Sequence, residues 1–130
     1  VLPYVADLPR CLAECARVLR PGGRLVFSLD HPLRDCFFDA EDGELVPYPV
    51  RSYFAGEPVR WRWPGCGVAV ATHHFTVGQW MDLLAAAGLH LVRIVEPAPP
   101  VAMLDDLWPE DGPLAALRCV PQTVIFVATS

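Results

Sequence analysis

The sequence contains no lysine, and its ten basic residues are all arginines, scattered from Arg10 to Arg118 without a run or a stripe. Fifteen acidic residues give a formal net charge of -5 at pH 7. A nucleic-acid surface needs clustered positive charge to displace the counterions of the phosphate backbone. The charge pattern therefore excludes nucleic acid as a partner.

Long apolar runs and cysteine motifs are also missing. No apolar run approaches the roughly 20 residues that span a bilayer, so we expect no membrane segment. The five cysteines form no C-x-x-C pair, and no secretory signal precedes them, which predicts free thiols in the cytoplasm. Cys11 and Cys15 lie one helical turn apart, but a zinc site would need two more ligands, so we expect no metal.

The composition is that of a globular domain with a single core, because 53% of the residues are hydrophobic and only 19% are charged. The chain begins with Val1 rather than with methionine. Its first residues read like the end of a strand followed by a loop. We therefore expect the chain to be part of a longer protein.

The best-defined local pattern is a helix followed by a buried strand. Residues 7–19 have apolar side chains at helical spacing; Asp7 can cap the first turn, and Pro9 fits there because no donor is needed. The sequence Pro21-Gly22-Gly23 ends the helix. The apolar run at 24–29 has no alternation, which predicts a strand covered on both faces in a mostly parallel sheet. Helix, glycine turn and strand together indicate an α/β unit.

The rest of the chain contains further elements and one irregular segment. Residues 33–72 are rich in proline and aromatic residues and predict an inserted β-rich flap, in which 59–63 pairs with 68–73 across a glycine turn. Thr76 and Gln79 have capping-box spacing and begin a helix that ends before Gly88. Strands are predicted at 89–96 and 122–128. Between them lies a proline-rich loop with a short helical turn at 114–117.

The segment from Leu12 to Ser28 resembles the helix, R-V-L-x-P-G-G turn and strand in the second half of class I S-adenosylmethionine-dependent methyltransferases. The small-molecule branch of that family commonly shows H-P, Y-H-R, A-G-F and E-P in later positions. Here the matching places hold His31-Pro32, His74, Ala87-Gly88-Leu89 and Glu96-Pro97. The resemblance spans nearly the whole chain.

The resemblance implies that residues 1–130 are the C-terminal half of a methyltransferase domain, with an insertion at about 33–72. The fold would be the C-terminal part of a Rossmann-like seven-stranded α/β sheet. The cofactor would be S-adenosylmethionine, and the methyl acceptor a small molecule. Leu2, Pro3 and Tyr4 would pass beside the methionine part of the cofactor.

The sequence also departs from that family. The glycine-rich turn after the first strand and the acidic residue after the second, which hold the cofactor, are both missing. Pro3 stands where histidine is usual, and Phe75 where the Y-H-R pattern has arginine. We therefore expect that this chain alone neither binds the cofactor tightly nor turns over.

Candidate site residues follow the predicted strands and occupy the flap. His31 lies at the carboxyl end of a strand, where α/β sheets bind ligands, and could remove a proton; His74 is the second catalytic candidate. The alternative for each is a packed or loop histidine. Substrate contacts are expected from strand-end, flap and neighbouring residues: Ser28, Asp30, His73, Tyr53, Phe54, Trp61 and Trp63. Trp61 and Trp63 share a face of their strand, and the alternative is that they only anchor the flap.

Two other functions remain open. The chain could be a non-catalytic α/β fragment that associates through an exposed apolar sheet edge. It could also belong to a nucleotide-dependent oxidoreductase, whose upstream half would carry a dinucleotide fingerprint.

Overall fold

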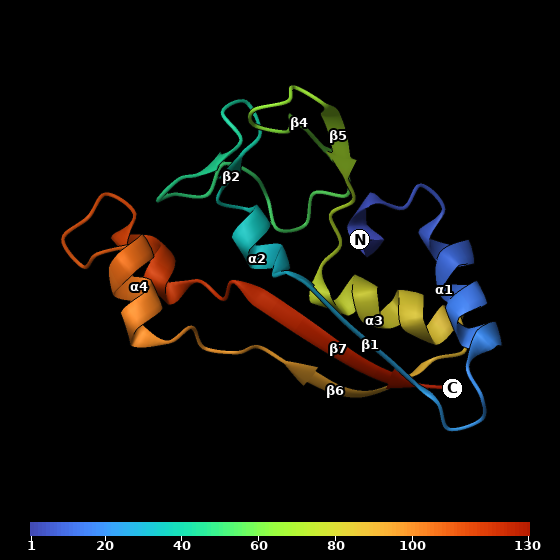
Figure 1. Cartoon of the computed structure of the whole chain (residues 1–130). Helices are drawn as coiled ribbons and strands as arrows, with labels where there is room; N and C mark the ends of the chain where they lie inside the picture. Colours follow the sequence, from blue (N-terminus) through green and yellow to red (C-terminus); the bar gives the residue numbers. More distant parts are fainter.

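A computed structural model describes all residues 1–130, arranged as a small α/β fold (Figure 1). The helices are η1 (Leu2–Tyr4), α1 (Leu8–Val18), α2 (Pro32–Asp35), α3 (Val77–Ala86), α4 (Val101–Leu107) and η2 (Ala115–Cys119). The strands are β1 (Arg24–Asp30), β2 (Phe38–Asp39), β3 (Glu44–Leu45), β4 (Val59–Arg62), β5 (Ala69–Thr72), β6 (His90–Val95) and β7 (Thr123–Thr129).

The main sheet has three strands in the order β1-β7-β6. β7 runs antiparallel to both neighbours, in register from Arg24 opposite Thr129 to Asp30 opposite Thr123 on the β1 side. The strand predicted at 122–128 is therefore present as the central, antiparallel strand of this sheet. β1 and β6 run in the same direction, and their carboxyl ends lie at the same edge of the sheet.

The predicted helix and glycine turn before β1 are confirmed. The Asp7 carboxylate caps α1 by accepting the N–H of Arg10 at 3.1 Å. Gly22 has a φ of +72°, and a Cβ on Gly23 would lie 2.7 Å from the carbonyl oxygen of Arg20. The chain can turn this tightly into β1 only because both positions lack a side chain.

The core lies between α1, α3 and one face of the sheet. α1 contributes Leu8 and Leu12, and α3 contributes Trp80 and Leu84. β7 alternates strictly, so Val124, Phe126 and Ala128 point into this core, each fully buried. Phe126 stacks on Phe27 of β1 with ring centroids 5.2 Å apart. The capping box that begins α3 is complete, as predicted from Thr76 and Gln79.

The prediction that β1 is covered on both faces is wrong. Leu25, Phe27 and Leu29 pack against the core, but Val26 on the other face is 58% exposed. β1 has a single neighbour, β7, and the two core helices cover only one face of the sheet. An apolar run without alternation thus forms an edge strand with one open face in this chain.

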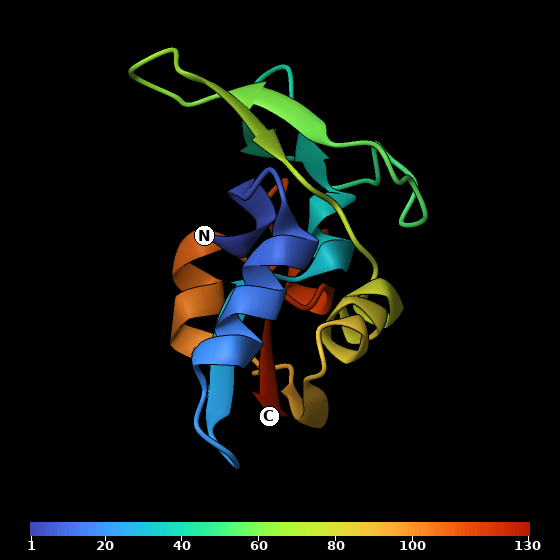
Figure 2. The ribbon, with the colours of Figure 1, turned by 90° about the vertical axis from the view of Figure 1, so that its right-hand side faces the viewer.

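Two small hairpins lie beyond the carboxyl end of β1. β2 pairs with β3, and β4 pairs with β5, so that Val59 is opposite Thr72 and Trp61 is opposite Val70. The pairing predicted for β4 and β5 is confirmed. Figure 2 shows this hairpin as a layer above α1 and α3, at the end of the molecule opposite the C-terminus.

Three helices differ from the sequence prediction. Residues 2–4 form the 3-10 helix η1 rather than the end of a strand, because they lack a neighbouring strand to pair with and instead close a local turn from Tyr4 N–H to the carbonyl of Val1. The short α2 follows His31, where Pro32 occupies the first helical position. α4 forms within the segment predicted as a loop and lies beyond the carboxyl end of β6 (Figure 1).

Candidate functional site

Two adjacent cavities lie at the carboxyl end of β1. The strand-end cavity has a volume of about 310 Å³, and its lining includes Pro3, Tyr4, Ser28, Asp30, His73 and Phe75. The aromatic cavity has a volume of about 340 Å³, and its lining includes Tyr4, Phe38, Trp61, Trp63, Asp30 and Asp35. Tyr4, Asp30, Asp35 and Thr72 line both, so the two cavities share a wall.

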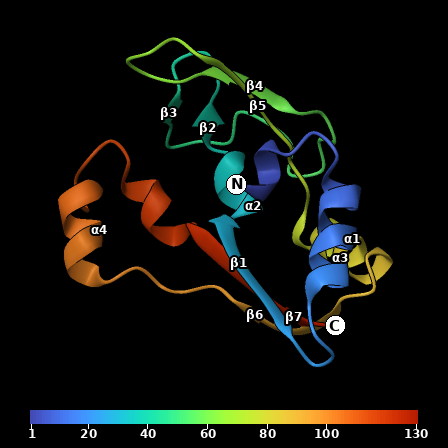
Figure 3. The same cartoon turned by 45° about the vertical axis from the view of Figure 1, so that its right-hand side comes forward.

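The N-terminal segment is held against β5, which places Tyr4 in the shared wall. The N–H of His73 donates to the carbonyl of Pro3 at 2.8 Å. Figure 3 shows this segment beside α2 at the end of β1. Pro3 and Tyr4, predicted beside the cofactor, therefore lie with Ser28, Asp30 and His73 around one cavity. Leu2 instead packs against the core.

The carboxylates in the shared wall have different partners. Asp30 makes an ion pair with Arg34, one helical turn on, at 3.1 Å. Asp35 has no guanidinium partner, and its carboxylate faces Nδ1 of His74 at 3.3 Å. An arginine therefore compensates the negative charge of Asp30, whereas no arginine compensates that of Asp35.

His74 is enclosed, with 1% of its side chain exposed, and does not line either cavity. Its Nε2–H donates to the carbonyl of Tyr53 at 2.9 Å. A carbonyl oxygen can only accept, so Nε2 carries a proton, and Nδ1 faces the Asp35 carboxylate. The bond to Tyr53 fixes the orientation of the His74 ring beside Asp35.

His31 is also buried, and both of its ring nitrogens are engaged. The N–H of Leu33 donates to Nδ1 at 3.0 Å, and Nε2 lies 2.8 Å from Oε1 of Glu96. Because Nδ1 accepts, the neutral ring carries its proton on Nε2 and donates it to the Glu96 carboxylate. His31 therefore has no free lone pair to accept a proton in this arrangement. It caps α2 and joins the ends of β1 and β6, which fits the loop-histidine alternative.

The aromatic side chains divide into two groups. The Trp61 and Trp63 rings lie 5.1 Å apart, and Phe38 meets Trp61 edge-on at 5.5 Å. Nε1–H of Trp61 also donates to the Thr72 hydroxyl at 3.0 Å, which fixes the indole across the hairpin. The two tryptophan rings therefore lie side by side in the lining of the aromatic cavity, as their shared face predicts.

Tyr53 and Phe54 lie outside both cavities. The Tyr53 hydroxyl accepts the N–H of Val77 in the first turn of α3, at 3.1 Å. Phe54 is 82% exposed. The structure therefore separates these two residues from the tryptophans with which the sequence grouped them, because Tyr53 is used to cap α3.

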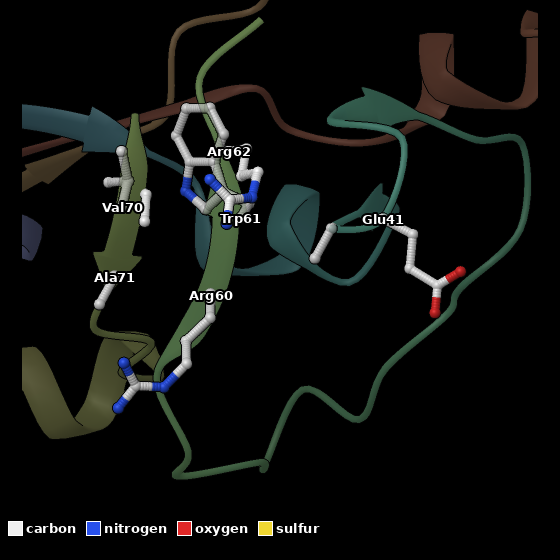
Figure 4. Close-up of a pocket in the computed structure, with 8 residues that line it drawn as sticks. Glu41, Arg60, Trp61, Arg62, Val70 and Ala71 are labelled. Atoms are coloured by element: carbon white, nitrogen blue, oxygen red, sulfur yellow. The ribbon is translucent and has the colours of Figure 1, made fainter. Parts of the chain in front are cut away.

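A third, more open depression of about 500 Å³, the outer groove, lies along the β4–β5 hairpin (Figure 4). Arg60, Arg62 and Glu41 contribute its charged side chains. Arg62 donates to the carbonyl of Gly67 at 2.8 Å. Arg60 and Arg62 thus line the outer groove and not the aromatic cavity, Trp63 lines the aromatic cavity, and Trp61 lines both.

Two thiols have shifted acidities. Burial raises the pKa of Cys36, and the neighbouring Asp35 carboxylate raises it further against an opposing effect of Arg51. Burial also raises the pKa of Cys15, with smaller contributions from Cys11. Both residues therefore favour the neutral thiol, which is the opposite of what a thiolate metal ligand requires.

The sequence prediction missed Asp35, Thr72 and Phe38 as site residues. Asp35 lies on α2, and its position depends on a helix that was not expected. The sequence Asp30-His31-Pro32 could have predicted a helix beginning at Pro32, because proline is favoured at the first position of a helix. Thr72 and Phe38 gave no such signal, since their side chains reach the site only through the folding of the hairpins.

Comparisons with known proteins point in one direction. Residues 1–27 match the family model described as a methyltransferase domain. Over 126 residues the chain is 30% identical to a probable S-adenosylmethionine-dependent methyltransferase of Mycolicibacterium smegmatis, an alignment that covers 91% of this chain and 45% of that protein.

Solved structures give the same result. An S-adenosylmethionine-dependent methyltransferase from Mesorhizobium loti superposes with a TM-score of 0.73 at 28% identity, covering 100% of this chain and 58% of the other. A putative enzyme of the same kind from Listeria monocytogenes gives 0.72 at 23% identity, covering 100% and 57%, and supports the fold. The chain spans about half the length of these relatives. No helix of the chain is both long and apolar enough to cross a membrane.

Proposed function

Because the chain is related in sequence and fold to part of the S-adenosylmethionine-dependent methyltransferases, we propose that it forms the acceptor side of a methyl-transfer site for a small molecule. The observation that carries the proposal is the pair of cavities at the carboxyl end of β1. Open α/β sheets bind their ligands beyond the carboxyl ends of strands. No observation favours an oxidoreductase, since the relatives are methyltransferases.

The proposal includes a larger architecture. In the whole protein, the three-stranded sheet would be the C-terminal part of a seven-stranded sheet, with residues 33–72 as an inserted flap over the site. The free edge of β1 and its exposed Val26 support further strands or another chain at that edge. The five free cysteines support placing the protein in the cytoplasm.

The residues present fit only one end of S-adenosylmethionine. Tyr4 and Asp30 in the strand-end cavity suit its sulfonium and ammonium groups, which are both cationic. Gly22 and Gly23 precede β1, and Gly65 and Gly67 close the β4–β5 hairpin, so neither glycine turn leads from a strand into a helix where it could hold the nucleoside. We therefore expect this chain to recognise the methionine part and to bind the whole molecule weakly.

Methyl transfer asks little of the protein beyond alignment and exclusion of water, because S-adenosylmethionine supplies an already activated methyl group. Asp35 lies in the wall common to both cavities, next to the His74 ring, and can orient an acceptor between them. Trp61 and Trp63 exclude water from the far side of the acceptor. His31 contributes by fixing the end of β1 against Glu96.

Calorimetry and a transfer assay with methyl-tritiated S-adenosylmethionine test the proposal. The chain alone should bind more weakly than the micromolar range and should not turn over; micromolar affinity would contradict this. The same assays then use the reading frame extended upstream of Val1, where we expect methyl transfer. A dinucleotide fingerprint upstream, with hydride transfer and no methyl transfer, would replace the proposal by the oxidoreductase alternative.

A further inference from the structure

The aromatic cavity combines two features that together select a type of ligand. Four aromatic side chains, Tyr4, Phe38, Trp61 and Trp63, contribute to its lining. Aromatic faces carry negative potential and attract cations, most strongly in tryptophan. The Trp61 ring is held in place by its bond to Thr72 and by its edge contact with Phe38, so this surface is formed before a ligand arrives.

The charges around the cavity also favour a cation. Arg34 is the one basic side chain in its lining, and it is paired with Asp30. The Asp35 carboxylate faces only the edge of His74, and 23% of its side chain is exposed. Asp35 is therefore available as a counter-charge. Arg60 and Arg62 line the outer groove instead, so the hairpin directs its unpaired positive charge away from this cavity.

The alternatives are less well matched. An anionic acceptor would meet two carboxylates and an arginine that is already paired. A neutral aromatic acceptor could stack on the tryptophans, but it would leave Asp35 without a partner next to apolar surface, which is costly. A cation satisfies both the rings and the carboxylate.

We propose that the aromatic cavity binds the cationic nitrogen of a small aliphatic amine, and that the methyl acceptor is an amine of this class. This inference rests on the proposed function. In the reaction, the bound ammonium first gives up a proton to solvent, which frees the nitrogen lone pair. The lone pair then forms the new N–C bond while the S–C bond breaks and its electron pair stays on sulfur. Positive charge thus returns to nitrogen as it leaves sulfur, and Trp61, Trp63 and Asp35 stabilise it as it develops.

A binding experiment without the cofactor tests the cavity by itself. Choline and its uncharged isostere 3,3-dimethylbutan-1-ol are titrated separately, with tryptophan fluorescence as the readout. Trp61 and Trp63 line the cavity, whereas Trp108 is buried elsewhere and the buried Trp80 lines the neighbouring strand-end cavity. Choline should bind about 10-fold more tightly than the isostere, in line with a cation–π contact of moderate strength. Equal affinities would overturn the proposal.

Variants assign the effect to the cavity. Asp35→Asn keeps the shape of the side chain and should weaken choline binding about 3- to 10-fold without changing binding of the isostere. Trp63→Leu should weaken choline binding more than Trp63→Phe does. Trp63→Phe keeps an aromatic ring and so controls for a loss of folding caused by the substitution itself. Arg60→Gln, on the outer groove, is the matched control and should leave choline binding unchanged. Unchanged binding in both Asp35→Asn and Trp63→Leu would overturn the assignment.

The choline experiment and the methyl-transfer assay can fail independently, so the amine proposal and the proposed function are tested separately. Selective choline binding without methyl transfer by the extended reading frame would keep the cation site and refute the transferase. Methyl transfer to phenols or carboxylates, with no preference for choline, would keep the transferase and refute the amine.

Discussion

Replacement of His31 distinguishes a structural role from a catalytic one. The imidazole is buried, its Nδ1 caps α2 through Leu33 at 3.0 Å, and its Nε2 contacts Glu96 at 2.8 Å. Loss of a helix cap costs about 1 kcal/mol. Loss of a hydrogen bond to a half-exposed carboxylate costs about 1 kcal/mol more. We therefore expect His31→Ala to lower the free energy of unfolding by about 2 kcal/mol.

His31→Asn separates the two contributions. Its amide oxygen can still accept the N–H of Leu33, but the side chain is too short to reach Glu96, so about half of the lost stability should return. Urea unfolding followed by tryptophan fluorescence measures both variants. Equal stability of His31→Ala and the unchanged protein would refute the structural role. A loss of methyl transfer of about 100-fold or more when His31→Asn is made in the extended reading frame, with stability intact, would restore the role as proton acceptor.

Three further predictions concern a cap, a thiol and an edge. Thr76→Ala should lower the free energy of unfolding by about 1 kcal/mol, because it removes the hydroxyl of the capping box, and Thr76→Ser should restore most of it; equal urea midpoints for the two variants would contradict this. Cys36 should react with Ellman's reagent more slowly than the exposed Cys66. Because the pKa of Cys36 is higher in the folded chain, its contribution to stability is complete below the unfolded pKa and is lost as the pH rises above about 9; urea midpoints that do not fall at alkaline pH would count against it. Val26→Glu should weaken any association through the open edge of β1, seen in sedimentation as a shift toward monomer; a compact monomer at every concentration of the unchanged chain would refute that association.

Local signals in the sequence predicted the elements that depend on local chemistry. Asp7, the Gly22-Gly23 turn and the Thr76–Gln79 box each act within a few residues, so their roles can be read without knowing the fold. The strict alternation of β7 appears only in the folded chain, where α1 and α3 cover one face. The error on β1 has the same origin, because burial depends on which neighbours are present rather than on the strand itself.

The candidate site was predictable only in part. Residues at the end of β1, such as Asp30, could be placed at the carboxyl edge of the sheet from the sequence. The hydrogen bond between His31 and Glu96 joins positions 65 residues apart, and no local sequence pattern predicts it. The same holds for the contact of His74 with Asp35, which depends on how the hairpin segment folds back over α2. Such pairings give His31 and His74 structural partners, and the catalytic role expected of each stays a prediction.

The most direct test of the central claim is a chemical-shift titration of the isotope-labelled chain with S-adenosylmethionine. Millimolar ligand should shift the amides of Tyr4, Ser28, Asp30 and His73 around the strand-end cavity and leave those of Arg60 and Ala71 in the outer groove unchanged. Shifts confined to the outer groove, or none at all, would contradict the assignment of the β1 end as the methyl-transfer site.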